Sequence, residues 1–140
     1  MYDAIEAEQP DAVCHLGDHL EDAESMEAVF PEVDFYHVPR NCDYFTTVRP
    51  SLTLELDGVR IFMTHGHLFG VKSGEERLVL EARRLGAQLA LYGHTHRAAL
   101  RQDGTLWVMN PGACGAGRSD YGSIITDGSG GFVCRLLHAE

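Results

Sequence analysis

The apolar residues of this chain fall into two patterns: short continuous runs, and positions three to four residues apart. Continuous runs of strand length predict buried strands, whereas the wider spacing predicts helices with one apolar face. The predicted helices cover residues 1–9, 20–30 and 74–85. The predicted strands cover residues 12–16, 33–38, 51–56, 59–63, 87–92, 98–101, 105–109, 121–126 and 131–137.

Turn residues connect several of these elements. The pairs Asp57-Gly58 and Asp103-Gly104 each separate two apolar runs, which is a strong signal for a β-hairpin. Gly86 follows the third predicted helix and is typical of a helix C-terminus. Strands and helices alternate in the first half, and hairpins dominate the second. We therefore expect an α/β fold: a two-layered mixed β-sheet sandwich flanked by helices, forming a single domain over residues 1–140.

The charge distribution argues against nucleic acid as a partner. The chain has 140 residues and a formal net charge of −10. Residues 1–60 hold 14 acidic and 3 basic residues, whereas residues 61–140 hold 7 acidic and 8 basic residues. No run of Lys or Arg forms the basic patch that phosphate backbones require, so no nucleic-acid patch is expected.

The apolar runs and the cysteines bear on localisation. No run approaches the length needed to span a membrane, and the acidic N-terminus lacks the pattern of a signal peptide. The four cysteines form no Cys-x-x-Cys pair. Reduced, buried thiols are the simplest interpretation, and we expect a cytoplasmic protein with no membrane partner.

Four apolar runs end on, or shortly before, residues that bind metals. Open α/β sheets bind ligands beyond the carboxyl ends of their strands, so these side chains are expected to converge at one rim. The residues are Asp18, Asn41, His65, His94 and His96. Carboxylate, amide and imidazole ligands suit Mn, Fe, Zn or Ni better than Ca. A His-x-His pair by itself equally fits a solvated loop, and it is the recurrence at four strand ends that favours a metal site.

Four motifs occur in order: Gly17-Asp18, Asn41-Cys42-Asp43, His65-Gly66-His67 and Gly93-His94-Thr95-His96. Together they resemble the signatures of the calcineurin-like metallophosphoesterases, specifically the small single-domain phosphodiesterases of bacteria and archaea. Asn110-Pro111-Gly112 resembles a further marker of that branch. The resemblance spans nearly the whole chain.

The resemblance implies two adjacent divalent metals, with Mn favoured and Fe, Zn or Ni as alternatives. A hydroxide bridging the metals attacks phosphorus in line in this family. Asp18 would bridge the metals, and His96 would belong to the first site. The second site would be completed by Asn41, His65 and His94. Asn110 and Arg118 are candidate substrate-binding residues in loops lining the site.

One departure from the family pattern concerns the first metal. Family members begin with a strand ending in Asp-x-His, which supplies two of its ligands, and this chain opens within the first predicted helix. The first site therefore keeps Asp18 and His96, and the second is better preserved. We expect the domain to be N-terminally incomplete, with Met1 an internal methionine of a longer chain.

A second departure concerns the catalytic residues. Arg40 stands where the family usually has glycine, and it adds a donor near the metals. Cys42 stands where many members carry a histidine thought to act as general acid. His67 could protonate a leaving group or line the pocket. Arg40, Cys42 and His67 are therefore the candidate catalytic residues.

Three functions compete. The leading hypothesis is a metal-dependent phosphoesterase, with a small phosphodiester preferred as substrate. The alternative is a non-catalytic scaffold or binding module of the same fold, because half of the first metal site is missing. A mononuclear structural metal site is the third, and the residue types match an open catalytic site better. Relatives that form dimers also make a homo-oligomer an expectation.

Overall fold

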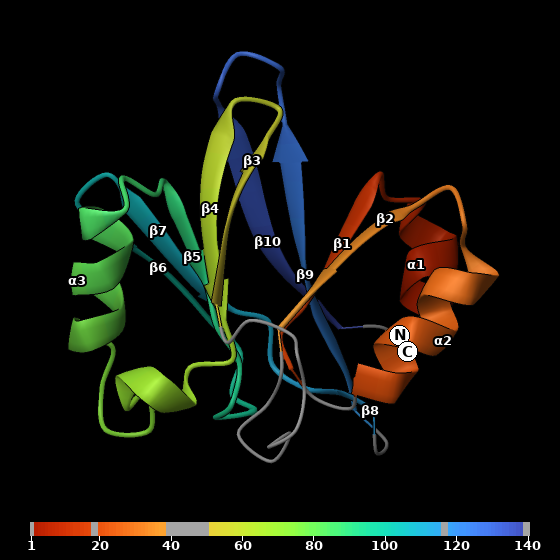
Figure 1. Cartoon of the computed structure of the whole chain (residues 1–140), viewed down its shortest axis with the longest axis horizontal. Coiled ribbons are helices and arrows are strands. Elements are labelled where there is room, and N and C mark those ends of the chain that lie inside the picture. Colours follow the sequence, from red (N-terminus) through yellow and green to blue (C-terminus); the bar gives the residue numbers. More distant parts are fainter. Residues whose placement is uncertain (1, 18–19, 39–50, 116–117, 139–140) are drawn as a thin grey trace.

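The computed structural model of the chain describes residues 2–17, 20–38, 51–115 and 118–138 (Figure 1). The helices are α1 (Tyr2–Glu8), α2 (Leu20–Val29), the 3₁₀ helix η1 (His67–Phe69) and α3 (Glu76–Arg84). The strands are β1 (Ala12–His15), β2 (Asp34–His37), β3 (Ser51–Leu56), β4 (Val59–Thr64), β5 (Leu89–Leu91), β6 (Ala99–Asp103), β7 (Leu106–Asn110), β8 (Cys114–Gly115), β9 (Arg118–Thr126) and β10 (Phe132–His138).

The described strands form three sheets. The largest is mixed and has the order β3-β4-β5-β7-β6, in which β4, β5 and β7 run parallel to one another. β1 and β2 form a parallel pair, and β10-β9-β8 is antiparallel. The three parallel strands of the large sheet point their carboxyl ends the same way, and this orientation places the two histidine motifs at one edge.

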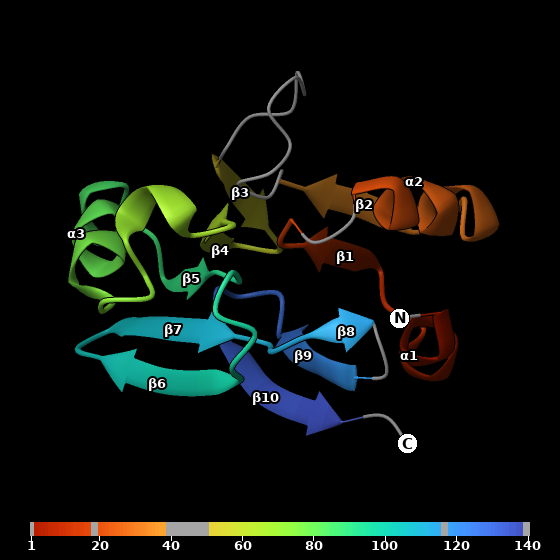
Figure 2. The same ribbon diagram turned by 90° about the horizontal axis from the view of Figure 1, so that it is seen from below.

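Helices cover the strands from two opposite sides. Figures 1 and 2 show α3 on one side and α1 and α2 on the other, with the strands between them. One face of the large sheet packs against α3 through the buried residues Phe62, Leu78, Val79, Ala82, Ala90 and Val108. The other face packs against β1, β2, β9 and β10. This arrangement confirms the predicted α/β sandwich flanked by helices.

Alternation along β4 explains how one strand serves both faces. Ile61 and Met63 point into the core shared with β10, whereas Phe62 points into the core shared with α3. All three side chains are at most 2% exposed. The strand is buried on both faces and therefore reads as a continuous apolar run, as expected for a parallel strand inside a sandwich.

The two hairpins predicted at Asp57-Gly58 and Asp103-Gly104 are confirmed, and the predicted strands 121–126 and 131–137 pair as a third. β3 pairs with β4, β6 with β7 and β9 with β10, all antiparallel. Asp57 and Gly58 both have positive φ, 53° and 82°, which is the backbone conformation that a two-residue hairpin turn requires.

Several predicted boundaries were wrong by a few residues. The third helix begins at Glu76 and not at residue 74, because Gly74 has φ 142°, outside the helical region. β9 begins at Arg118, three residues before the predicted start. The short elements η1 and β8 were not predicted. Both fall below the length at which a sequence pattern can be recognised.

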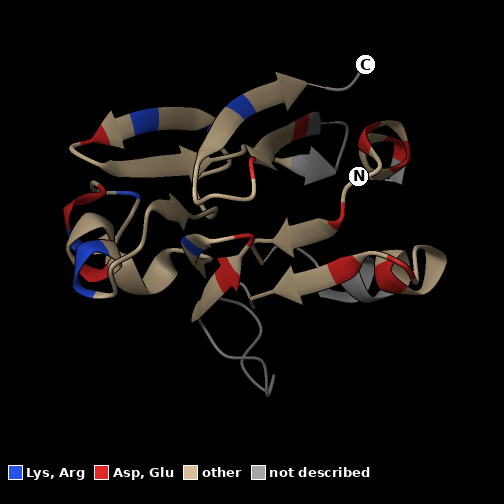
Figure 3. Ribbon diagram, turned by 90° about the horizontal axis from the view of Figure 1, so that it is seen from above, with Lys and Arg blue, Asp and Glu red and all other residues tan. Residues whose placement is uncertain are grey.

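The two ends of the molecule differ in charge. Figure 3 shows acidic residues on α1, and both acidic and basic residues on α3 at the opposite end. In the ranges that the structure describes, no helix combines the length and apolar character needed to cross a membrane. Cys14 and Cys134 are free thiols, and burial raises the pKa of each to about 11, so both stay protonated at neutral pH. Cys42 lies outside the described residues.

Candidate metal centre

The two histidine motifs follow two neighbouring parallel strands. β4 ends at Thr64, immediately before His65, and β5 ends at Leu91, three residues before His94. The strands pair in register, with Met63 opposite Leu91. The ladder continues beyond them, since the backbone N–H of Gly93 donates to the carbonyl of His65 at 3.0 Å. The two motifs therefore leave the sheet side by side at its carboxyl edge.

Three imidazoles meet at this edge. The ring centroids of His65 and His94 are 4.9 Å apart, those of His65 and His67 are 5.6 Å apart, and those of His67 and His94 are 6.3 Å apart. Nε2 of His65 lies 3.1 Å from Nδ1 of His94. The structure thus brings together His65 and His94, which are 29 positions apart in the sequence, as predicted from their places at the carboxyl ends of neighbouring strands.

A backbone carbonyl fixes the orientation of His65. Its Nδ1 lies 2.7 Å from the carbonyl oxygen of Leu16, just after β1. A carbonyl oxygen can only accept, so Nδ1 donates, and Nε2 of the neutral ring carries the lone pair. Metal-binding histidines are oriented in this way, with one ring nitrogen donating to a carbonyl and the other free to coordinate.

The electrostatics favour neutral imidazoles. Partial burial lowers the pKa of His94, and the charges of His65, Lys72, His67 and His96 lower it further. Burial also lowers the pKa of His67. Metal binding requires deprotonated imidazoles, so both shifts act in its favour.

One buried nitrogen of this cluster lacks a partner within the described part of the chain. Nδ1 of His67 is buried and makes no hydrogen bond there, and neither does Nδ1 of His37 at the end of β2. Buried polar atoms are nearly always hydrogen-bonded or coordinated. The orphaned nitrogen of His67 and the paired nitrogens of His65 and His94 make these imidazoles candidate ligands, which need further groups to complete a cation site.

The turn that carries the second motif has an unusual backbone. His94 and His96 have φ of 69° and 58°, in the left-handed region that residues other than glycine rarely adopt. Asn110, at the end of β7, is fully buried, and its amide nitrogen donates to Thr95 Oγ1 at 2.8 Å and to the Gly93 carbonyl at 3.2 Å. Backbone strain of this kind persists only where surrounding contacts hold it, and the bonds from Asn110 are such contacts.

The remaining predicted site residues are only partly described. Asp18, Arg40, Asn41 and Cys42 lie outside the described residues, and so does the side chain of Arg118. Within the described residues, no group of three His, Cys, Asp or Glu side chains has an arrangement that could hold a metal. The complete ligand set, with Asp18 and Asn41 beside the histidines, stays a prediction.

Sequence patterns missed three contributors to this edge. Lys72 is close enough to His94 for its charge to lower the pKa of that histidine. The Leu16 carbonyl orients His65, and Glu75 accepts a hydrogen bond from Tyr92. Lys72 lies in none of the motifs identified in the sequence. The other two contacts depend on tertiary structure and leave no trace in a motif.

The lowered histidine pKa values predict acid destabilisation of the metal-free chain. A histidine whose pKa is lower when folded than when unfolded, about 6.5, binds protons more readily in the unfolded chain. The unfolding temperature should therefore hold above pH 6.5 and fall as the pH drops through the lowered values. Thermal unfolding followed by circular dichroism between pH 7.5 and 5 measures this fall.

The His94→Gln variant should show a shallower fall with pH than the native chain, because one of the two shifted groups is gone. His138→Gln, which removes an exposed β10 histidine that pairs with Asp120 outside this cluster, serves as the comparison for loss of an imidazole. Carboxyl groups with lowered pKa values, such as Glu81, Asp103 and Asp127, also lose stability as the pH falls, but they are present in all three proteins. Equal slopes in all three proteins would contradict this assignment.

Comparisons with known proteins bear on this edge and on the fold around it. Residues 1–127 match the calcineurin-like phosphoesterase superfamily domain. The probable metallophosphoesterase YsnB of Bacillus subtilis is 32% identical over 104 residues, which cover 74% of this chain and 59% of YsnB. The phosphodiesterase YfcE of Escherichia coli K12 is 32% identical over 99 residues, which cover 62% of this chain and 50% of YfcE. The chain thus spans between half and three fifths of the length of these relatives.

Solved structures show the same fold. A predicted phosphoesterase from Streptococcus pneumoniae superposes with a TM-score of 0.75 at 26% identity, covering 98% of this chain and 80% of that one. Vps29 from Entamoeba histolytica, solved as a Zn²⁺ complex, superposes with a TM-score of 0.70 at 16% identity, covering 97% and 86%. At that identity the second likeness concerns the fold alone. Since the domain match runs through residues 1–127 and the strand-end histidines fall inside it, the chain belongs to the calcineurin-like phosphoesterase superfamily.

Proposed function

We propose that this chain is a metal-dependent phosphoesterase that prefers phosphodiesters. The observation that carries the proposal is the pair of imidazoles from β4 and β5, with His65 Nε2 at 3.1 Å from His94 Nδ1. The names of the relatives, metallophosphoesterase and phosphodiesterase, support the same chemistry. The metal ligands in this proposal are Asp18, Asn41, His65, His94 and His96.

Divalent cations held by these residues would neutralise charge on the phosphoryl group and lower the pKa of a coordinated water. The protein's own contribution is to present neutral, oriented imidazoles. His65 does so through its Nδ1 contact to the Leu16 carbonyl, and His94 through its lowered pKa. Manganese is the proposed native metal, because a mixed oxygen and nitrogen ligand set suits it.

The substrate side of the proposal rests on positive charge. Lys72 is exposed and lies near His94, so it can meet an anionic phosphoester from the solvent side. Arg40 and Arg118 are proposed to add further cationic contacts. His67 would line the site, and its lowered pKa leaves little of the ring protonated at neutral pH, so it is seldom available as a proton donor. Cys42 is the second candidate proton donor.

Metal titration combined with hydrolysis tests the proposal. The chain is stripped of metal, incubated with Mn²⁺ at increasing concentration and analysed for bound Mn²⁺ and for hydrolysis of bis(p-nitrophenyl) phosphate. Because the second site keeps more predicted ligands, we expect about one tightly held Mn²⁺ per chain and a weaker second one. Turnover should follow the weaker site and disappear in His94→Ala. His138→Ala, which removes an exposed imidazole, should keep both binding and turnover.

Two outcomes would contradict the phosphoesterase proposal. Tight metal binding without hydrolysis of either the diester or p-nitrophenyl phosphate would favour the non-catalytic binding module. Hydrolysis that His94→Ala leaves unchanged would place the activity elsewhere or in a contaminant. Faster hydrolysis of the monoester would keep the reaction type and correct the substrate preference.

A further inference from the structure

Asn110 has its side-chain hydrogen-bonding groups committed to the two turns beside it. The amide nitrogen donates to the Gly93 carbonyl at 3.2 Å and to Thr95 Oγ1 at 2.8 Å. The amide oxygen accepts from the backbone N–H of Gly112 at 3.0 Å. The side chain is 0% exposed. A primary amide has two N–H donors, and both have acceptors here, so no donor is left to reach a substrate.

The turn that Asn110 contacts is strained. It holds His94 and His96 at positive φ, each at about 1 kcal/mol or more. The Gly93 carbonyl accepts from both Asn110 and the backbone N–H of Thr95, the latter at 2.8 Å. Strained conformations of this kind persist only where the surrounding structure holds them. Asn110 therefore contacts both Gly93, which precedes His94, and Thr95, which lies between His94 and His96.

Tyr92, immediately before this turn, is fixed from the other side. Its backbone N–H donates to the Met109 carbonyl at 3.1 Å, next to Asn110. Its hydroxyl donates to Glu75 Oε2 at 2.5 Å, and Arg101 Nε donates to Glu75 Oε1 at 2.6 Å. Tyr92 is 5% exposed. The hydroxyl contact ties the turn to the residue that precedes α3.

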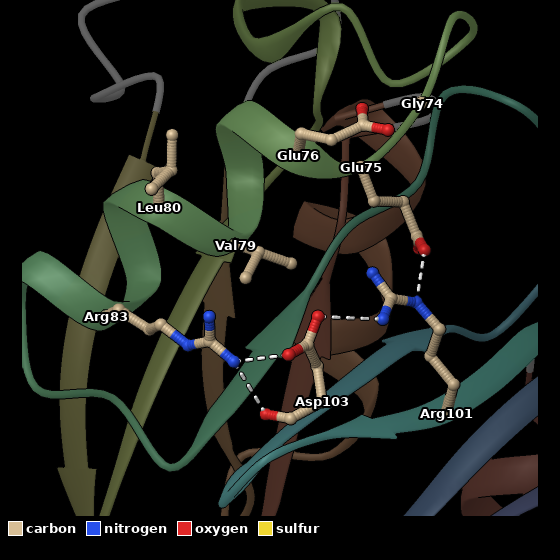
Figure 4. Close-up of a pocket in the computed structure, with 8 residues that line it drawn as sticks. All are labelled: Gly74, Glu75, Glu76, Val79, Leu80, Arg83, Arg101 and Asp103. Carbon is tan, nitrogen blue, oxygen red and sulfur yellow. Dashed lines mark hydrogen bonds and ion pairs between the residues drawn. The ribbon is translucent and has the colours of Figure 1, made fainter.

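Glu75 lines a cavity of about 540 Å³. Figure 4 shows Arg101 between Glu75 and Asp103, and Arg83 on the far side of Asp103. The Arg101 side chain is 43% exposed and that of Glu75 is 20% exposed. Exposed ion pairs are screened by salt and contribute little. The buried contacts of Tyr92 and Asn110 are therefore the ones that hold the turn.

We propose that Asn110 and Tyr92 are positioning residues that hold the turn 93–96 and so orient the imidazoles of His94 and His96. This assignment differs from the substrate-binding role that the Asn-Pro-Gly motif predicts for Asn110. The orientation of the two imidazoles is a property of the chain without metal. Its consequence for catalysis rests on the proposed function.

Two mild variants test the proposal. Thr95→Val keeps the shape of the side chain and removes the acceptor for Asn110, whereas Tyr92→Phe removes the hydroxyl that donates to Glu75. Tyr121→Phe is the matched control, since the Tyr121 hydroxyl donates to Glu8 at 2.8 Å on a distant part of the molecule. Each tyrosine variant removes a Tyr–Glu hydrogen bond, part-buried at Tyr92 and exposed at Tyr121, and Tyr92 also hydrogen-bonds Asn110, so the unfolding temperature of each variant is measured alongside.

The first readout is the set of histidine ring ¹⁵N signals of the metal-free full chain. We expect the His94 and His96 signals to move in Thr95→Val and Tyr92→Phe, while those of His37 and His138 stay in place. Zn²⁺ affinity, measured by calorimetry, should fall about 10-fold or more in both variants, as it does when outer contacts of metal ligands are lost. Tyr121→Phe should leave the ring signals and the affinity unchanged.

Ring signals that stay in place in both test variants, with unfolding temperatures lowered as in Tyr121→Phe, would overturn the proposal and make both residues merely structural. Moved signals in a chain that binds no Zn²⁺ would support the positioning role and would count against the metal-dependent function. The histidine ring signals of the metal-free chain thus distinguish failure of the positioning role from failure of the proposed function.

Discussion

Replacing His65 with alanine is expected to weaken Zn²⁺ binding by about 100-fold or more. Loss of a contact that only orients a metal ligand costs about 10- to 100-fold in affinity, and this substitution removes the ligand itself. His65 is 2% exposed, and its ring is fixed by the Leu16 carbonyl at 2.7 Å. Its Nε2 faces His94 at 3.1 Å. At such a buried position, water cannot easily enter to supply a replacement ligand.

Stability and affinity have to be separated in this experiment. Alanine leaves the Leu16 carbonyl without its donor, at about 1–3 kcal/mol for a buried acceptor. His65→Gln retains an amide N–H that can reach this carbonyl, so it should unfold closer to the native temperature while binding Zn²⁺ poorly. His138→Ala, which removes an exposed imidazole, should bind Zn²⁺ as the native chain does. Native affinity in both His65 variants would remove His65 from the ligand set.

The meeting of His65 and His94 could be predicted from the sequence because strand periodicity carries the information. The apolar runs before each motif predict buried strands, and the carboxyl ends of neighbouring parallel strands share one edge. The third helix follows in the same way, since Leu78, Val79 and Ala82 recur at helical spacing and are all buried. These elements rest on local patterns that tertiary contacts reinforce.

What the sequence could not show depends on contacts between distant backbone and side-chain atoms. The Leu16 carbonyl that orients His65 is a backbone group, and every residue has one. The role of Asn110 depends on its distance to Thr95 and Gly93, which no spacing encodes. The motif predicts that Asn110 lies near the site, and its complete burial suggests that it acts through the turn.

The Gly66→Ala substitution is expected to lower the free energy of unfolding by about 2–6 kcal/mol, a large share of the 5–15 kcal/mol typical of a domain. Gly66 has φ 110°, a conformation that side-chain-bearing residues rarely adopt. Backbone strain of this kind costs about 1–3 kcal/mol. An added Cβ would also lie 2.8 Å from Cγ2 and 3.3 Å from Cγ1 of Val71, which is 5% exposed. Overpacking of a buried position adds about 1–3 kcal/mol.

Gly70 provides the control for this prediction. It also has positive φ, 61°, but a Cβ added there meets nothing within 4 Å. Gly70→Ala should therefore lower the free energy of unfolding by only about 1 kcal/mol, because it adds a side chain to left-handed backbone without a clash. Urea unfolding of both variants measures the difference.

Val71→Ala removes the clashing methyl groups, so the Gly66→Ala/Val71→Ala double variant should be more stable than the sum of the single effects predicts. Equal losses in Gly66→Ala and Gly70→Ala, with additive effects in the double variant, would show that Val71 does not press on Gly66. Because Gly66 lies between His65 and His67, the same clash should displace both imidazoles, and their ring signals should move in Gly66→Ala but not in Gly70→Ala.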